Sequence, residues 1–168
     1  ISISAPVGGG HHFTAEYFQI NPDSVLPTPY TRFFKDATLN HVSGCEYWIL
    51  DRTNGASNVD VTLSWDDRSC GVSNLGDLRV ARWDGAMWRD HGNGGTTGSN
   101  ANGTVVTSGP VTTFSPFTLA SSTNENPLPI ELLSFTAELI NNTVELNWQT
   151  STEINNDYFT LEKSIDGV

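Results

Sequence analysis

Hydrophobic and polar residues alternate with a period of two along much of the chain. Residues 46–50 and 59–65 show this pattern best and are rich in β-branched and aromatic side chains. The same pattern recurs at residues 78–83, 104–107 and 114–119, with turn-forming residues at 53–55, 66–69 and 92–103. No window of eleven or more residues carries a helical apolar stripe. We therefore predict an all-β chain of antiparallel strands.

Asp84-Gly85 lies between two alternating runs, a combination typical of a tight β-hairpin. A two-residue loop would pair Trp83 with Ala86 and Ala81 with Trp88. The two tryptophans would then lie diagonally on one face, within reach of each other. Two interpretations follow: the indole rings belong to the core, or they form an exposed platform that stacks on sugar rings.

The stretch 92–103 contains Asn, Gly, Thr and Ser and almost no apolar residue. Because it is too polar for a core strand, we predict a long exposed hairpin loop or a flexible insert. As a loop it serves either as a contact surface or as a plain connection.

Composition changes over residues 121–129, a segment that contains no aromatic residue and has two prolines, at 127 and 129. We predict a β-sandwich over 1–124, for which a jelly roll is one candidate topology, a linker over 125–129, and a second β module over 130–168. The second module has three predicted strands, at 130–139, 143–149 and 158–164. Three strands cannot close a sandwich, so we expect more chain to follow or another molecule to supply strands.

The chain has 19 acidic residues against 8 lysines and arginines, and a formal net charge of −11. Such a charge repels nucleic-acid phosphates and anionic membranes, and no apolar run is long enough to span a bilayer. We expect neither nucleic-acid binding nor direct membrane insertion. The beginning at Ile1, with no signal sequence, favours a mature product or an internal segment.

Four segments of the second module together resemble a known family: 129–137, 144–148, 155–159 and 161–167. They are similar to the fibronectin-III-like module near the carboxy terminus of many Bacteroidetes secreted proteins, which are cargo of the type IX (Por) secretion system. The resemblance implies an Ig/fibronectin-III-like sandwich with Trp148 as a buried strand residue and Tyr158 opening the next strand.

The upstream portion resembles uncharacterised β modules of the same large surface proteins, through residues 13–18, 46–52, 78–85 and 114–119. Those modules occur beside adhesins, repeats and hydrolases. The resemblance implies an exported structural or adhesive segment, located outside the cell or on its surface, and it provides no catalytic residue.

Cys45 and Cys70 are the two cysteines of the chain. In an exported protein such a pair indicates one disulfide, worth about 3 kcal/mol for a loop of this size. The alternative is two buried free thiols.

The sequence contains few other candidate sites for metal binding or covalent modification. Asp66, Asp67 and Asp90 lie at turns and are weak candidates for a structural calcium ion, although no EF-hand loop is present. No other cofactor is expected, and the cysteines and histidines lack zinc-ligand spacing. Asp23-Ser24-Val25 resembles an acceptor for periplasmic O-glycosylation on Ser24.

No nucleophile elbow, metalloprotease motif or phosphate-binding loop is present, so we expect no enzyme activity. The expected function is that of a non-catalytic, extracellular structural or adhesive β module of a larger secreted or surface-attached bacterial protein, including a fibre or surface-assembly component. Its partners would be other domains of that protein, a second copy, or a surface glycan. The alternative is a carbohydrate-binding accessory module of a secreted hydrolase, in which Trp83 and Trp88 would stack on the ligand.

Overall fold

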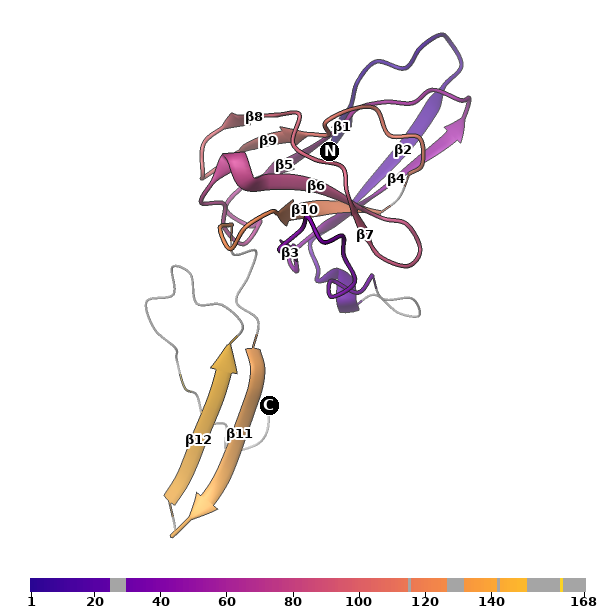
Figure 1. The fold of residues 1–168 in the computed structure, drawn as a ribbon. Helices are drawn as coiled ribbons and strands as arrows, with labels where there is room; N and C mark the ends of the chain where they lie inside the picture. The colour runs from indigo at the N-terminus through magenta and orange to yellow at the C-terminus, as the bar shows by residue number, and fades with distance from the viewer. Residues whose placement is uncertain (25–29, 115, 127–131, 142, 151–160, 162–168) are drawn as a thin grey trace. The chain divides into compact units, whose positions relative to one another are not determined.

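The computed structural model describes residues 1–24, 30–114, 116–126, 132–141, 143–150 and Leu161. These residues are almost entirely β-strand and turn, and every pairing between the named strands is antiparallel, which confirms the predicted fold class (Figure 1). The chain divides into two compact units, 1–129 and 130–168.

The first unit is built from two sheets. One sheet has the strand order β1-β5-β9-β8, with bounds Ser2–Ile3, Val61–Trp65, Gly103–Val106 and Gly95–Gly98. The other has the order β2-β4-β10-β6-β7, with bounds His12–Phe18, Tyr47–Asn54, Phe117–Ser121, Leu78–Trp83 and Trp88–Asp90. A short strand β3 (His41–Val42) also pairs with β10, and two 3-10 turns, η1 (Pro22–Ser24) and η2 (Leu75–Asp77), complete the elements.

The main core lies between these two sheets, which makes the unit a β-sandwich. Alternate residues of β5 and β9 face alternate residues of β4, β6 and β10, as the period of two requires. The buried members of this core are Trp48, Leu50, Val61, Leu63, Trp65, Val72, Leu78, Val80, Val105, Val111, Phe117 and Leu119. A second, smaller cluster on the other face of the larger sheet contains Leu39, Val42, Ala81, Trp88 and Ala120. Strand β10 is buried over its whole length because its residues contribute to both hydrophobic clusters, one on each face of the larger sheet.

The hairpin between β6 and β7 differs from the predicted one. Trp83 pairs directly with Trp88, and four residues, 84–87, form the loop. The Asp84 side chain accepts hydrogen bonds from the backbone N–H groups of Ala86 and Met87, both at 2.9 Å. The predicted two-residue loop was wrong because this side chain stabilises a wider turn, which places the two indole rings side by side.

Part of the predicted loop over 92–103 is also a strand. Residues 95–98 form β8, which pairs with β9 at the edge of the smaller sheet. An edge strand gains backbone hydrogen bonds without needing apolar side chains, so the polar composition was a poor guide here. The connections that remain within this stretch are residues 92–94 and the short loop 99–102.

The beginning of the predicted linker belongs to the first unit. Asn126 is fully buried, and its side chain accepts from the N–H groups of Ser73 and Asn74 and donates to the Asn74 carbonyl and the Ser121 hydroxyl. The Glu125 carboxylate accepts from the Ser73 hydroxyl at 2.8 Å. These bonds fasten the segment to the loop before η2, so residues 125 and 126 belong to the sandwich.

The second unit contains the hairpin of β11 (Leu132–Ile140) and β12 (Thr143–Thr150). One face carries the cross-strand pairs Phe135–Trp148, Ala137–Leu146 and Leu139–Val144. Four of these side chains are between 41% and 73% exposed: Phe135, Leu139, Val144 and Trp148. We call these six residues the apolar hairpin face. The third predicted strand, 158–164, lies outside the described residues except for Leu161.

Candidate functional site

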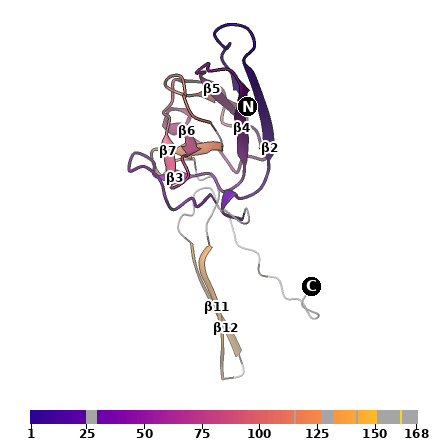
Figure 2. The same cartoon turned by 90° about the vertical axis from the view of Figure 1, so that its right-hand side faces the viewer.

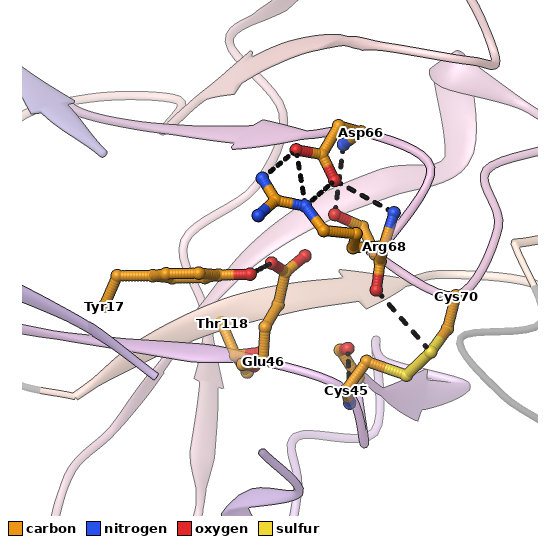
Figure 3. The surroundings of a disulfide bond; sticks show 9 residues. Tyr17, Cys45, Glu46, Asp66, Arg68, Cys70 and Thr118 are labelled. Atoms are coloured by element: carbon orange, nitrogen blue, oxygen red, sulfur yellow. Dashed lines mark hydrogen bonds and ion pairs between the residues drawn. A yellow bond between two sulfur atoms is a disulfide. The ribbon is translucent and has the colours of Figure 1, made fainter. Parts of the chain in front are cut away.

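The Cys45–Cys70 disulfide joins the residues just before β4 to the turn after β5, and thus ties the two sheets together (Figure 3). Its Cα atoms are 6.2 Å apart, a separation that a disulfide spans readily. This confirms the predicted bond. Both half-cystines are partly buried, and the bond adjoins a buried carboxylate of the core.

That carboxylate belongs to Glu46, which is only 2% exposed. Glu46 precedes Trp48 and Leu50 by two and four residues, so the alternation of the strand turns all three toward the sandwich interior. The Thr118 hydroxyl of β10 donates to the Glu46 carbonyl at 2.6 Å. With the disulfide at the preceding residue, this bond fixes the backbone of Glu46 beside β10 in the larger sheet.

One oxygen of the Glu46 carboxylate has a partner and the other has none. The Tyr17 hydroxyl, on strand β2, donates to Oε2 at 2.8 Å (Figure 3). Oε1 is buried and makes no hydrogen bond with the described residues. Burial raises the pKa of Glu46, and this effect outweighs the opposing influence of the nearby Ser69 and Tyr17 hydroxyls. Desolvation and the bond to Glu46 raise the pKa of Tyr17 to about 12.

Residues 66–69 form a turn, as the sequence predicted, and the structure places this turn beside the carboxylate. Asp66 accepts from the backbone N–H of Arg68 at 2.9 Å and forms an ion pair with its guanidinium, which also lowers the pKa of Asp66. The Arg68 side chain is 57% exposed. The buried Ser69 hydroxyl accepts from the Asp66 N–H at 3.1 Å. The turn thus places the Asp66–Arg68 ion pair, whose two charges cancel, next to Glu46.

These groups surround a pocket of about 210 Å³. Its walls come from the first residue, β2, β4 and the residue before it, β5 and the turn that follows β5: Ile1, Tyr17, Glu46, Trp48, Ser64, Trp65, Asp66, Arg68 and Ser69. Tyr17 and Trp48 are cross-strand partners with ring centroids 5.4 Å apart, and the Trp65 indole N–H donates to the Ser99 carbonyl at 3.0 Å. The pocket therefore combines fixed aromatic rings, a buried carboxylate and an ion pair.

Sequence reasoning missed Glu46 as a candidate, although the signal was present. The alternation 46–48–50 places a glutamate in register with two core residues, and a charged residue on the inward face of a strand is uncommon. The contact with Tyr17 could not be found in this way, because it depends on the pairing of β2 with β4.

The structure brings Trp83 and Trp88 together, with ring centroids 5.6 Å apart. However, Trp88 has no exposed surface, and its N–H donates to the Tyr30 carbonyl at 3.3 Å. Because a fully buried ring cannot stack on a ligand, the core interpretation holds for Trp88. Trp83, which packs against the same cluster, is half-buried.

The calcium candidates do not converge. Asp66 is paired with Arg68, Asp67 is exposed, and Asp90 ends β7, where it accepts from the Gly92 N–H at 2.7 Å. Within the described ranges, no three His, Cys, Asp or Glu side chains group as metal ligands would. Ser24 is exposed at the end of η1, and its hydroxyl donates to the Asn21 carbonyl at 2.6 Å, while Val25 lies outside the described residues.

Comparison with known proteins gave no match: no family model, no curated protein and no solved structure is similar to this chain. Where the structure describes the chain, it contains no helix of the length and apolarity needed to cross a membrane.

Proposed function

We propose that this chain is a non-catalytic, extracellular structural or adhesive module of a larger secreted or surface-attached bacterial protein. The observation that carries the proposal is the Cys45–Cys70 disulfide within a well-packed sandwich. Disulfides persist in oxidising compartments and are rare in the cytosol, so the bond favours an exported protein. The resemblance of the second module to type IX secretion cargo supports the same location.

The apolar hairpin face supports a role in assembly. A two-stranded hairpin is marginally stable by itself, and an apolar face gains free energy when another β structure covers it. The cover would come from other domains of the same protein or from a second copy. Because the chain carries a net charge of −11, association between copies works against electrostatic repulsion and gains from added salt.

Sedimentation of the 168-residue chain, from micromolar to near-millimolar concentration, tests the assembly role. We expect the mass-average molecular weight to rise with concentration and with salt. The double variant Leu139→Ser/Val144→Ser removes a cross-strand pair of the apolar hairpin face and is expected to weaken this rise. Thr136→Ala/Asn147→Ala, a pair on the opposite face, is the matched control and keeps it. A chain that stays monomeric throughout contradicts the assembly role.

A further inference from the structure

Strand β2 lies at the outer edge of the larger sheet, with β4 as its neighbour on one side (Figure 2). Among the described residues of the first unit it is the longest edge strand, with seven residues against two in β1, three in β7 and four in β8. Within the same residues, its backbone groups pair only with β4, and those on the other side have no backbone partner. Such an edge is a template for the addition of another strand.

The sequence of β2 lacks the residues that usually protect an edge strand from association. It contains no proline and no lysine, and Glu16 is its one acidic residue. The irregularity in its pairing with β4 lies between His12 and Phe13, and the register is regular from there to the end of the strand. Because Phe13 packs against the core, alternation turns His12, Thr14 and Glu16 to the opposite face, where all three are exposed.

The charges of this exposed face fit a second copy of the strand in antiparallel orientation. If Thr14 pairs with Thr14 of the second copy, each Glu16 lies opposite a His12 of the other strand. The imidazole then donates to the carboxylate or, when protonated, forms an ion pair with it. Opposite-charge pairs and Thr–Thr pairs are among the favourable cross-strand pairs.

Repulsion between the two Glu16 carboxylates selects this register over its neighbour. With Thr14 at the centre, the two Glu16 residues are about 14 Å apart, beyond the screening length of about 8 Å in physiological salt. With Ala15 at the centre, they would come to about 8 Å from each other, and each would face a threonine in place of His12.

From this arrangement we propose that β2 adds to β2 of a second copy of this chain, antiparallel and with Thr14 opposite Thr14, so that the two larger sheets join into one. This pairing rests on the proposed assembly role and extends it to a surface of the first unit, separate from the apolar hairpin face. It spans residues 12–16 of each strand, and the net charge of −11 opposes it, so we expect the dimer only at high protein concentration.

Cysteine cross-linking of the 168-residue chain at near-millimolar concentration tests the pairing. Both native cysteines are in the disulfide, so an introduced cysteine supplies the free thiol. Every variant also carries Leu139→Ser/Val144→Ser, which weakens association through the apolar hairpin face. Thr14→Cys is expected to form a disulfide-linked dimer under mild oxidation, because residues directly opposite each other have Cβ atoms about 4.5–5.5 Å apart.

Asp51→Cys is the matched control. Asp51 pairs with Thr14 and is exposed, but it lies one strand further from the edge. In the proposed dimer its two copies would be about 14 Å apart, too far for a disulfide, so this variant should stay monomeric.

Charge reversal, followed by sedimentation, is the second measurement. Glu16→Lys lessens the general repulsion between copies, yet it removes the acceptor for His12 and should weaken the dimer about 2- to 30-fold, as expected for two lost cross-strand pairs. His12→Glu/Glu16→Lys restores opposite charges in reversed order and should recover the original affinity.

Three results would overturn the proposal: no cross-link through Thr14→Cys, equal cross-linking through Asp51→Cys, or tighter association of Glu16→Lys. A wild-type mass that rises with concentration, together with no cross-link through Thr14→Cys, would leave the assembly role standing and remove only the β2 pairing.

Discussion

Loss of the Cys45–Cys70 bond should destabilise the sandwich mainly through the unfolded chain. The two cysteines are separated by 25 positions, and closing a loop of that size lowers the entropy of the unfolded state by an amount worth about 3.5 kcal/mol. Both side chains are partly buried, so Cys45→Ala/Cys70→Ala removes little apolar contact. The lost restriction of the unfolded chain therefore accounts for most of the expected decrease in the free energy of unfolding.

The corresponding shift in melting temperature follows from the size of the first unit. An unfolding entropy of about 2 cal/mol/K per residue, over the 129 residues of that unit, converts 3.5 kcal/mol into about 13 °C. Circular dichroism melts of the double variant and of the oxidised wild type measure this difference. Wild type treated with reductant is the control and should melt with the variant. A difference below about 3 °C would refute the loop-closure reasoning.

Three further predictions concern buried groups. Because burial raises the pKa of Glu46, the folded state binds this proton more tightly than the unfolded state does. The contribution of Glu46 to stability is therefore greatest below the ordinary carboxyl pKa and is lost as the pH rises through the folded pKa. Melts between pH 4 and 8 should show wild type losing stability relative to Glu46→Gln, and parallel curves would contradict this sign. Trp88→Ala should cost about 3–5 kcal/mol in urea unfolding, and Trp83→Ala clearly less, because Trp88 alone is fully buried. Asn126→Ala should cost about 2–4 kcal/mol because it removes the hydrogen bonds of a fully buried amide to partly buried backbone groups, and a near-neutral result would show that residues 121–126 do not stabilise the sandwich.

The strands predicted best from sequence are those whose two faces differ most. Leu78–Trp83 was predicted with its observed bounds, because its apolar and β-branched residues point into the sandwich. Strand β2 was not predicted from alternation, since most of its residues are exposed at the edge of the sheet. Strand β8 was missed for a related reason: backbone pairing with β9 holds it there without apolar side chains.

The missed site features depend on contacts between distant segments. The Asp84-Gly85 signal indicated a hairpin correctly, but the register depends on the Trp83–Trp88 pair and on the burial of Trp88. Likewise, the pairing of Tyr17 with Glu46 spans 29 residues, and Asn126 reaches back 53 residues to Ser73. Local patterns predict elements, whereas these contacts arise only when the sheets assemble.

The central claim is that this chain belongs to an exported protein stabilised by a disulfide. The most direct test is peptide mapping of the protein recovered from the producing cells, separated into cytoplasmic, surface and medium fractions. The account predicts that the protein lies in the surface or medium fraction, with a linked peptide that joins Cys45 to Cys70 and no free thiol. Recovery in the cytoplasm with both cysteines reduced would contradict it.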